Sequence, residues 1–306
     1  MRGNKGGKVS IAALSYVAIA GLSFLFTKVA LGFSNPLDLL AHRFTASFLG
    51  IIIPISLKWV KVDFSRERIR KVLPLAIFYP LLFFGLQTFG LQYATSSEAG
   101  IILASAPVFT MILASYFLKE KTTLLQKLSI ILSVIGVSYI TIKTGSSFEF
   151  GNMKGILLLL LAALSFAGYS VMARGLTKDF STIELSCIMT IISFIGFNVL
   201  SIGKHLIDGS IGELFMPLGN PKFIMAALYL GVLSTLVTSI LTNYVLSKIE
   251  ASKMSVFANL VTVISVIAGA VFLKEEIFYY HIIGSILIIG GVLGTNFLGK
   301  EKQANP

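Results

Sequence analysis

Uncharged stretches of about 20 residues recur along the chain, and short segments that contain most of its charges separate them. A helix that crosses a bilayer needs about 20 predominantly apolar residues, so a stretch of this length predicts a transmembrane helix. Residues 44–57 and 128–142 reach that length only if their helices begin near Pro36 and at Leu124. With these two, the pattern predicts an all-α polytopic membrane protein of ten transmembrane helices. The other eight stretches are residues 9–27, 72–97, 99–118, 155–173, 185–203, 223–247, 254–273 and 277–299.

Two of the stretches allow a second interpretation. Residues 9–27 follow Arg2, Lys5 and Lys8, as in a secretory signal peptide. The apolar part is too long for a signal peptide, so we expect an uncleaved first helix. Residues 72–97 are long enough to suggest more than one span, but the prolines within them, Pro74 and Pro80, predict one kinked helix instead.

The composition excludes an ordinary soluble protein. Of 306 residues, 55% are hydrophobic and 13% are charged, and the mean hydropathy is +0.87, whereas soluble domains carry about 25% charged residues. A single cysteine, Cys187, excludes a disulfide framework, and the three widely spaced histidines give no zinc-binding spacing. We therefore expect no metal site and no cofactor.

The basic residues predict how the chain crosses the membrane. An N-terminus in the cytoplasm places 18 Lys and Arg in inner segments and five in outer ones. Inner loops are the ones enriched in positive charge, so we expect both termini in the cytoplasm and a location in the cell membrane. This accounts for the net charge of +11 without nucleic acid. The basic segment 66–71 is interpreted as a solvated inner loop, with attraction of anionic membrane lipid as the alternative.

The sequence also repeats itself. FLKE at residues 117–120 recurs at 272–275, an offset of 155 residues, and Ser97 matches Ser252 at the same offset. AGLSF at 20–24 matches AALSF at 162–166 at an offset of 142. The shared order predicts two repeats of five helices, at residues 1–145 and 151–300. Because five is odd, the second repeat enters the membrane from the opposite side. Inverted repeats of this kind are common in secondary transporters.

Several segments resemble a known family. They are AGLSFLFTK in the first helix, Arg43 early in the second, residues 93–121 with Thr95-Ser96-Ser97, Pro107-Val108 and Glu120, and AALSFAGYSVMAR at 162–174. Together they are similar to the drug/metabolite transporter superfamily, specifically its EamA-type ten-helix members. Gly21 stands where the family commonly has tryptophan, and Thr262 replaces an expected proline. The resemblance implies a metabolite or drug permease, usually an exporter, with helices 1, 3, 4, 6, 8 and 9 around a central cavity.

Three ionisable residues are candidates for function inside the membrane. Lys28 and Arg43 both fall in the outer half, Arg43 roughly 10 Å from the start of its helix. Lys28 is expected either to extend to the interface or to attract an anionic group. Arg43 is expected either to form a structural pair with Asp38 or Glu98 or to contact such a group. His42 is the one deep histidine, and no Asp or Glu lies in the middle of a span, so proton coupling has no support.

Neutral polar residues supply the candidate lining of the cavity. Amides in lipid leave hydrogen-bond donors unsatisfied, so they should face protein or water. Bonding between helices is the alternative to substrate contact. The aromatic residues Phe83, Phe84, Phe89 and Tyr169 could form an apolar wall. The substrate-binding candidates are Gln87, Ser105, Ser165, Tyr169, Asn243, Asn259 and Thr262.

Other motifs add little chemistry. Residues 294–300 match the start of a phosphate-binding loop, but Glu301 replaces the required Ser or Thr and no strand precedes it. No catalytic motif is present, so we predict no catalytic residues and no enzyme activity. Gly290 and Gly294 have the GxxxG spacing that permits close helix contact, either within the molecule or in a dimer.

These observations predict a secondary transporter that moves small metabolites, such as amino acids or amphipathic drugs, by alternating access, with export as the expected direction. An oligomeric channel and a membrane-embedded enzyme are the alternatives. The expected partners are a small-molecule substrate and membrane lipid. A monomer is the expected state, with a homodimer as the alternative.

Overall fold

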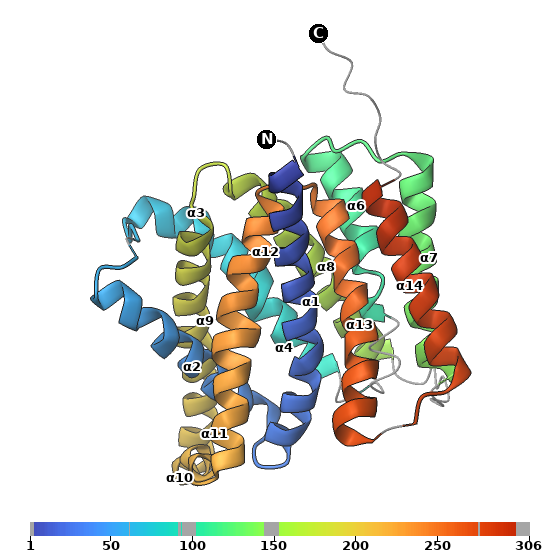
Figure 1. Cartoon of the computed structure of the whole chain (residues 1–306). Helices are drawn as coiled ribbons and strands as arrows, with labels where there is room; N and C mark the ends of the chain where they lie inside the picture. Colours follow the sequence, from blue (N-terminus) through green and yellow to red (C-terminus); the bar gives the residue numbers. More distant parts are fainter. Residues whose placement is uncertain are drawn as a thin grey trace.

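The computed structural model describes residues 3–60, 62–90, 93, 102–143, 153–274 and 276–297. Helices of both repeats lie side by side in one bundle, and α1 begins at the same end at which α14 finishes (Figure 1). In the described residues, nine helical segments are long and apolar enough to span a membrane, and α6 is a shorter apolar helix. Residues 94–101, which include the end of the predicted third span and the start of the predicted fourth, lie outside the described residues. The ten-helix prediction fits these segments.

The first half of the chain contains α1 (Gly3–Leu31), α2 (Pro36–Ser56), α3 (Arg66–Ala76), η1 (Ile77–Leu82), α4 (Phe83–Gly90), α6 (Ala106–Phe117) and α7 (Leu124–Lys143). The second half contains α8 (Met153–Leu176), α9 (Thr182–Asp208), α10 (Ile211–Phe215), η2 (Met216–Gly219), α11 (Pro221–Leu228), η3 (Tyr229–Val237), α12 (Thr238–Leu246), α13 (Ala251–Leu273) and α14 (Tyr279–Phe297). The segments α3–η1–α4 and α11–η3–α12 each form one span. They are called here the third helices of the two repeats.

Each third helix is irregular in its middle. In the first repeat, the backbone of Tyr79 is extended, with φ −148° and ψ 124°. A proline disfavours helical dihedrals in the residue before it, and Pro80 follows Tyr79. The predicted kink is therefore confirmed at Pro80, whereas Pro74 lies inside α3. In the second repeat, the π-helical segment η3 occupies the corresponding place without a proline.

Corresponding helices of the two repeats have corresponding neighbours. The first helix of the first repeat, α1, contacts η3 and α12 of the third helix and also α13. The first helix of the second repeat, α8, contacts η1 and α4 of the other third helix and also α6. The second helices α2 and α9 contact each other, as do the fifth helices α7 and α14. This pattern is that of two inverted repeats related by a pseudo-twofold axis.

The equivalence extends to single residues of α2 and α9 at an offset of 146. Asn35 accepts a hydrogen bond from the backbone N–H of Asp38 at the start of α2, and Ser181 accepts one from the N–H of Glu184 at the start of α9. Such N-cap bonds satisfy backbone donors that the first helical turn leaves free. The helix expected to begin near Pro36 therefore begins there. The second helix of each repeat therefore begins with the same type of N-cap hydrogen bond.

Two equivalent residues of these helices touch each other. The rings of Phe48 and Phe194 stack with centroids 4.3 Å apart and planes 8° from parallel. Ser47 and Ser193 are equivalent as well, and within the described ranges they carry the only buried side-chain oxygens without a hydrogen-bond partner. Since a residue and its own counterpart meet only near a twofold axis, the pseudo-axis passes close to the Phe48–Phe194 stack.

Helices α7 and α14 meet through glycines at an offset of 155. A Cβ on Gly136 would lie 2.7 Å from the carbonyl oxygen of Gly284, and one on Gly291 would lie 2.5 Å from that of Ser129. These two contacts are equivalent. A Cβ on Gly290 would meet only Leu132, at 3.8 Å. Gly136, Gly284 and Gly291 therefore make the close contact of these helices, whereas the predicted Gly290 does not.

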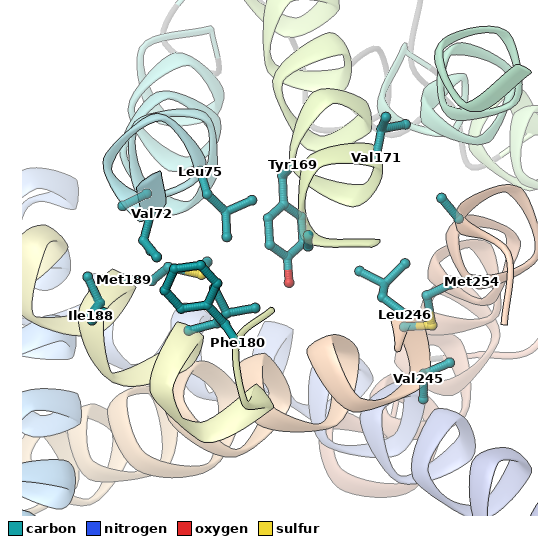
Figure 2. Close-up of a cluster of buried hydrophobic side chains, with 14 of the residues drawn as sticks. Val72, Leu75, Tyr169, Val171, Phe180, Ile188, Met189, Val245, Leu246 and Met254 are labelled. Atoms are coloured by element: carbon teal, nitrogen blue, oxygen red, sulfur yellow. The ribbon is translucent and has the colours of Figure 1, made fainter. Parts of the chain in front are cut away.

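The largest apolar cluster joins both repeats near the end of the bundle where α1 begins. It includes Val72 and Leu75 of α3, Tyr169 of α8, Leu246 of α12 and Met254 of α13, all buried. Figure 2 shows these side chains converging from several helices, with the Tyr169 hydroxyl pointing among them. The cluster closes this end of the bundle between the two halves.

Candidate substrate-binding site

Arg43 is a buried cation held by the irregular part of the opposite repeat. Its side chain extends from α2 to η3, and the residue is 8% exposed. Nε donates to the hydroxyl of Thr235 at 2.6 Å, and Nη2 donates to the carbonyl oxygen of Ser234 at 3.1 Å. The Thr235 hydroxyl in turn donates to the carbonyl of Leu230 at 2.8 Å. All these acceptors are neutral.

The expected pair between Arg43 and Asp38 is absent, so that prediction is wrong. Among the described residues, no ion pair joins Arg43 to a carboxylate. Five residues along a helix correspond to a rotation of about 140°, so Asp38 and Arg43 face different neighbours. Glu98, the other suggested partner, lies outside the described residues. The positive charge of Arg43 is therefore not neutralised by the part of the chain that the structure describes.

Asp38 instead has a buried partner on α9. Its carboxylate lies 2.9 Å from Nε2 of His205 and accepts a 2.6 Å hydrogen bond from Ser201. The other ring nitrogen of His205 lies 2.8 Å from the Ser210 hydroxyl. The sequence predicted that the span in α9 ends near residue 203, but the helix continues to Asp208. This contact accounts for the extension, because it places His205 in the protein interior.

An aromatic cluster lies beside Arg43. We use this name for Tyr79, Phe83, Phe84, Phe166 and Tyr169. The Arg43 guanidinium lies over the Phe84 ring at 4.6 Å, and Tyr79 stacks on Tyr169 at 4.6 Å. Phe83 and Phe166 are 5.5 Å apart. Of these five residues only Tyr169 is fully buried, and the other four are partly exposed. Arg43 and the aromatic cluster together form the candidate site.

Two of the predicted residues, Tyr169 and Asn243, bond to each other. The Tyr169 hydroxyl donates to Oδ1 of Asn243 at 3.1 Å, and the Asn243 amide donates to the Ser186 hydroxyl at 2.9 Å. Ser239 also donates to Ser186, at 3.0 Å. This network ties α8, α9 and α12 together at one side of the aromatic cluster. Bonding between helices therefore occupies both polar groups in this conformation.

Gln87 is placed differently. It lies one turn after Phe83 and Phe84 on the same face of α4 and is half-buried. Within the described part of the chain its amide has no hydrogen-bond partner, so none of these residues occupies its polar atoms. Gln87 is the predicted residue that best combines proximity to the aromatic cluster with unused hydrogen-bonding capacity.

Other predicted residues lie in separate places. Asn259 donates to the Ser133 hydroxyl at 3.0 Å, which joins α13 to α7. Ser105 precedes α6 and donates to the carbonyl of Ile102 at 2.5 Å. His42 lies 2.8 Å from the carbonyl of Leu214 in α10.

Three more predictions complete the set. Ser165 is buried and Thr262 is half-buried, and neither forms a side-chain hydrogen bond with the described residues. Lys28 falls within α1, but its side chain lies outside the described part of the structure. Whether any of these residues contacts a substrate stays a prediction.

Sequence reasoning did not identify Tyr79, Ser234 or Thr235 as parts of the site. Tyr79 was detectable as the residue before Pro80, at the predicted kink. Ser234 and Thr235 are two adjacent small polar residues in an otherwise apolar span. Neither carries a charge or fits a motif, so no pattern separated them from ordinary packing residues.

The sequence matches the EamA-like transporter family over residues 7–142 and 153–297. A relative from Bacillus subtilis, described as the uncharacterized transporter YcxC, is 47% identical over 97% of this chain and 95% of its own length. An uncharacterized transporter from Archaeoglobus fulgidus is 27% identical over 90% of this chain and 94% of its own.

A crystal structure of another protein superposes with a TM-score of 0.78, covers 96% of this chain and 98% of its own, and is 17% identical. This likeness concerns the fold alone. The sequence match, in contrast, covers both repeats and includes the second and third helices that carry the candidate site. The chain therefore belongs to the EamA-like transporter family, within the drug/metabolite transporter superfamily, and is a multi-pass membrane transporter.

Proposed function

We propose that the protein is a secondary transporter that exports small metabolites or amphipathic drugs from the cell by alternating access. The pairing of equivalent contacts in two inverted repeats carries this proposal. Two such halves can exchange conformations, so that a site between them opens to each side in turn. Arg43 and the aromatic cluster occupy a suitable place, because they join α2 and the third helix of the first repeat to η3 and α8 of the second.

The closed end of the bundle supports one state of such a cycle. Besides the apolar cluster, the Glu120 carboxylate accepts hydrogen bonds from the backbone N–H of Ala251 at 2.9 Å and the hydroxyl of Ser252 at 3.0 Å. These contacts link the two repeats at the start of α13. From the distribution of Lys and Arg, we assign this end to the cytoplasm, and we place the protein in the cell membrane.

The rival functions require other features. A channel would allow solute to equilibrate without an alternating site, and a membrane-embedded enzyme would need reactive groups next to its substrate. We propose no catalytic step and no cofactor for this chain. Since the proposed site lies within one chain, a monomer suffices, and a homodimer is the alternative.

Counterflow in proteoliposomes tests the proposal. Vesicles with the purified protein are loaded with an unlabelled amino acid or other small metabolite, and a trace of the labelled compound is added outside. A carrier exchanges the two and makes the label accumulate transiently above its equilibrium level, whereas a channel gives simple equilibration. Accumulation for at least one compound is expected. Equilibration without accumulation would contradict the proposal in favour of a channel.

The assigned orientation has its own test. Single cysteines replace Lys121 and Lys274 in a chain whose native Cys187 has been changed to alanine. A membrane-impermeant maleimide added outside intact cells should label position 274 and leave position 121 unlabelled. The reverse labelling pattern would place both termini outside.

A further inference from the structure

Among the described residues, no carboxylate neutralises the charge of Arg43, which is buried. Burying an ionised side chain without a partner of opposite charge is costly, and inside a membrane such groups are rare. Thr235 and Ser234 satisfy some of the guanidinium N–H groups, and the Phe84 ring adds a cation–π contact. No hydrogen bond from Nη1 to the described residues is present. Arg43 thus carries a positive charge and has Nη1 N–H groups that donate to none of the described residues.

The other repeat shows that the fold does not require this cation. At the offset of 146 that relates Asn35 to Ser181 and Phe48 to Phe194, the counterpart of Arg43 is Met189. Met189 is 1% exposed and packs in the large apolar cluster. An apolar side chain therefore serves the equivalent position of α9. Helix packing at this position therefore does not by itself require a cation.

The surroundings of Arg43 indicate what that ligand is. The guanidinium lies over Phe84, whose ring contacts Tyr79 and Phe83, and Phe166 contacts Phe83; all four aromatic residues are partly exposed. Among the described residues, no carboxylate is available beside these rings to hold an ammonium group, because Asp38 is engaged by His205. A ligand with one negative charge and an apolar body matches both features.

We propose that Arg43 binds the carboxylate of an organic anion whose apolar body packs on the aromatic cluster. This inference rests on the proposed transport function and narrows its substrate to monocarboxylates without a second, positive charge. The guanidinium can present two N–H groups to the two carboxylate oxygens. The ligand then supplies the negative charge that none of the described residues provides beside Arg43.

Binding of matched pairs of probes tests the proposal. Purified protein is equilibrated at pH 7 with labelled benzoate, 3-phenylpropionate and 4-methylpentanoate, and separately with their neutral amides. Charge-assisted hydrogen bonds contribute about 1.5–3 kcal/mol, so at least one carboxylate should bind about tenfold or more tightly than its amide. The Arg43→Met variant, which copies Met189, should bind both members of that pair equally.

Two further variants complete the design. Arg43→Lys keeps the charge but not the two-pronged geometry, so it should retain part of the preference. Lys204→Met removes an exposed cation near the end of α9 and should leave the preference unchanged. Should Arg43→Met not fold, Arg43→Gln replaces it, since an amide can still donate to Ser234 and Thr235.

The inference is overturned if no carboxylate binds more tightly than its amide, or if removing the Arg43 charge leaves the preference intact. Counterflow separates this failure from that of the proposed function. Accumulation of amides or zwitterions without any preference for carboxylates would refute the anion site while transport stands. A carboxylate that binds through Arg43 but gives no counterflow would refute transport while the anion site stands.

Discussion

Replacement of a single glycine by alanine tests how closely α7 and α14 approach. A Cβ on Gly291 would lie 2.5 Å from the Ser129 carbonyl oxygen and 2.6 Å from the Ser133 backbone nitrogen. Both distances are below contact distance, and backbone atoms cannot move aside as a side-chain end can. A Cβ on Gly290, the adjacent residue, would meet among the described residues only Leu132 within 4 Å, at 3.8 Å. The two substitutions add the same methyl group at neighbouring positions of one helix.

The expected loss of folding stability follows from the different surroundings of Gly290 and Gly291. Alanine is favoured over glycine within a helix by about 0.5–1 kcal/mol, and this gain applies to both variants. Overpacking a close interface costs about 1–3 kcal/mol, and this cost applies to Gly291→Ala alone. Gly291→Ala should therefore be less stable than Gly290→Ala by roughly 1–3 kcal/mol.

Thermal unfolding of the purified variants in one detergent measures the difference. Gly136→Ala is the equivalent substitution in the first repeat, and it should resemble Gly291→Ala. A Gly291→Ala variant at least as stable as Gly290→Ala would refute the proposed close contact. A large loss for Gly291→Ala with none for Gly136→Ala would refute the equivalence of the two repeats at this interface.

The buried contact between Asp38 and His205 should stabilise the packing of α2 on α9. Asp38→Asn and His205→Gln are each expected to lower the free energy of unfolding by about 1–3 kcal/mol. Their double variant should lose less than the sum, and strict additivity in thermal unfolding would contradict a direct interaction. Removing the cap of α13 with Glu120→Ala should loosen the closed end, measured as faster maleimide labelling of a cysteine at Met254; equal labelling rates would argue against that role. Gln87→Ala should lower counterflow without lowering the amount of folded protein, whereas unchanged flux would assign Gln87 to packing.

Features encoded locally could be predicted from the sequence. Each span is a run of apolar residues, and the kink at Pro80 depends on one proline. The inverted repeats were visible because short segments recur at nearly constant offsets. The side of the membrane on which each terminus lies stays a prediction from the uneven distribution of Lys and Arg. None of these predictions depends on which side chains contact each other in the folded structure.

Partners distant in the sequence could not be predicted in the same way. Arg43 bonds residues about 190 positions away, and Asp38 bonds His205, which is 167 positions away. Helical periodicity gives the face on which a residue lies but not the helix that it meets. The glycine contact shows the same limit. Neighbours on a helix point about 100° apart, so a motif that selects Gly290 misses the contact at Gly291.

The stack of Phe48 on Phe194 has a consequence for any exchange of shape between the two halves. In such an exchange, each residue takes up the contacts that its counterpart had before. Phe48 and Phe194 are counterparts that already contact each other. Their contact maps onto itself, and it would look the same before and after the exchange. If the halves exchange conformations, the Phe48–Phe194 contact therefore stays unchanged, and the displacement of the other helices can be measured relative to it.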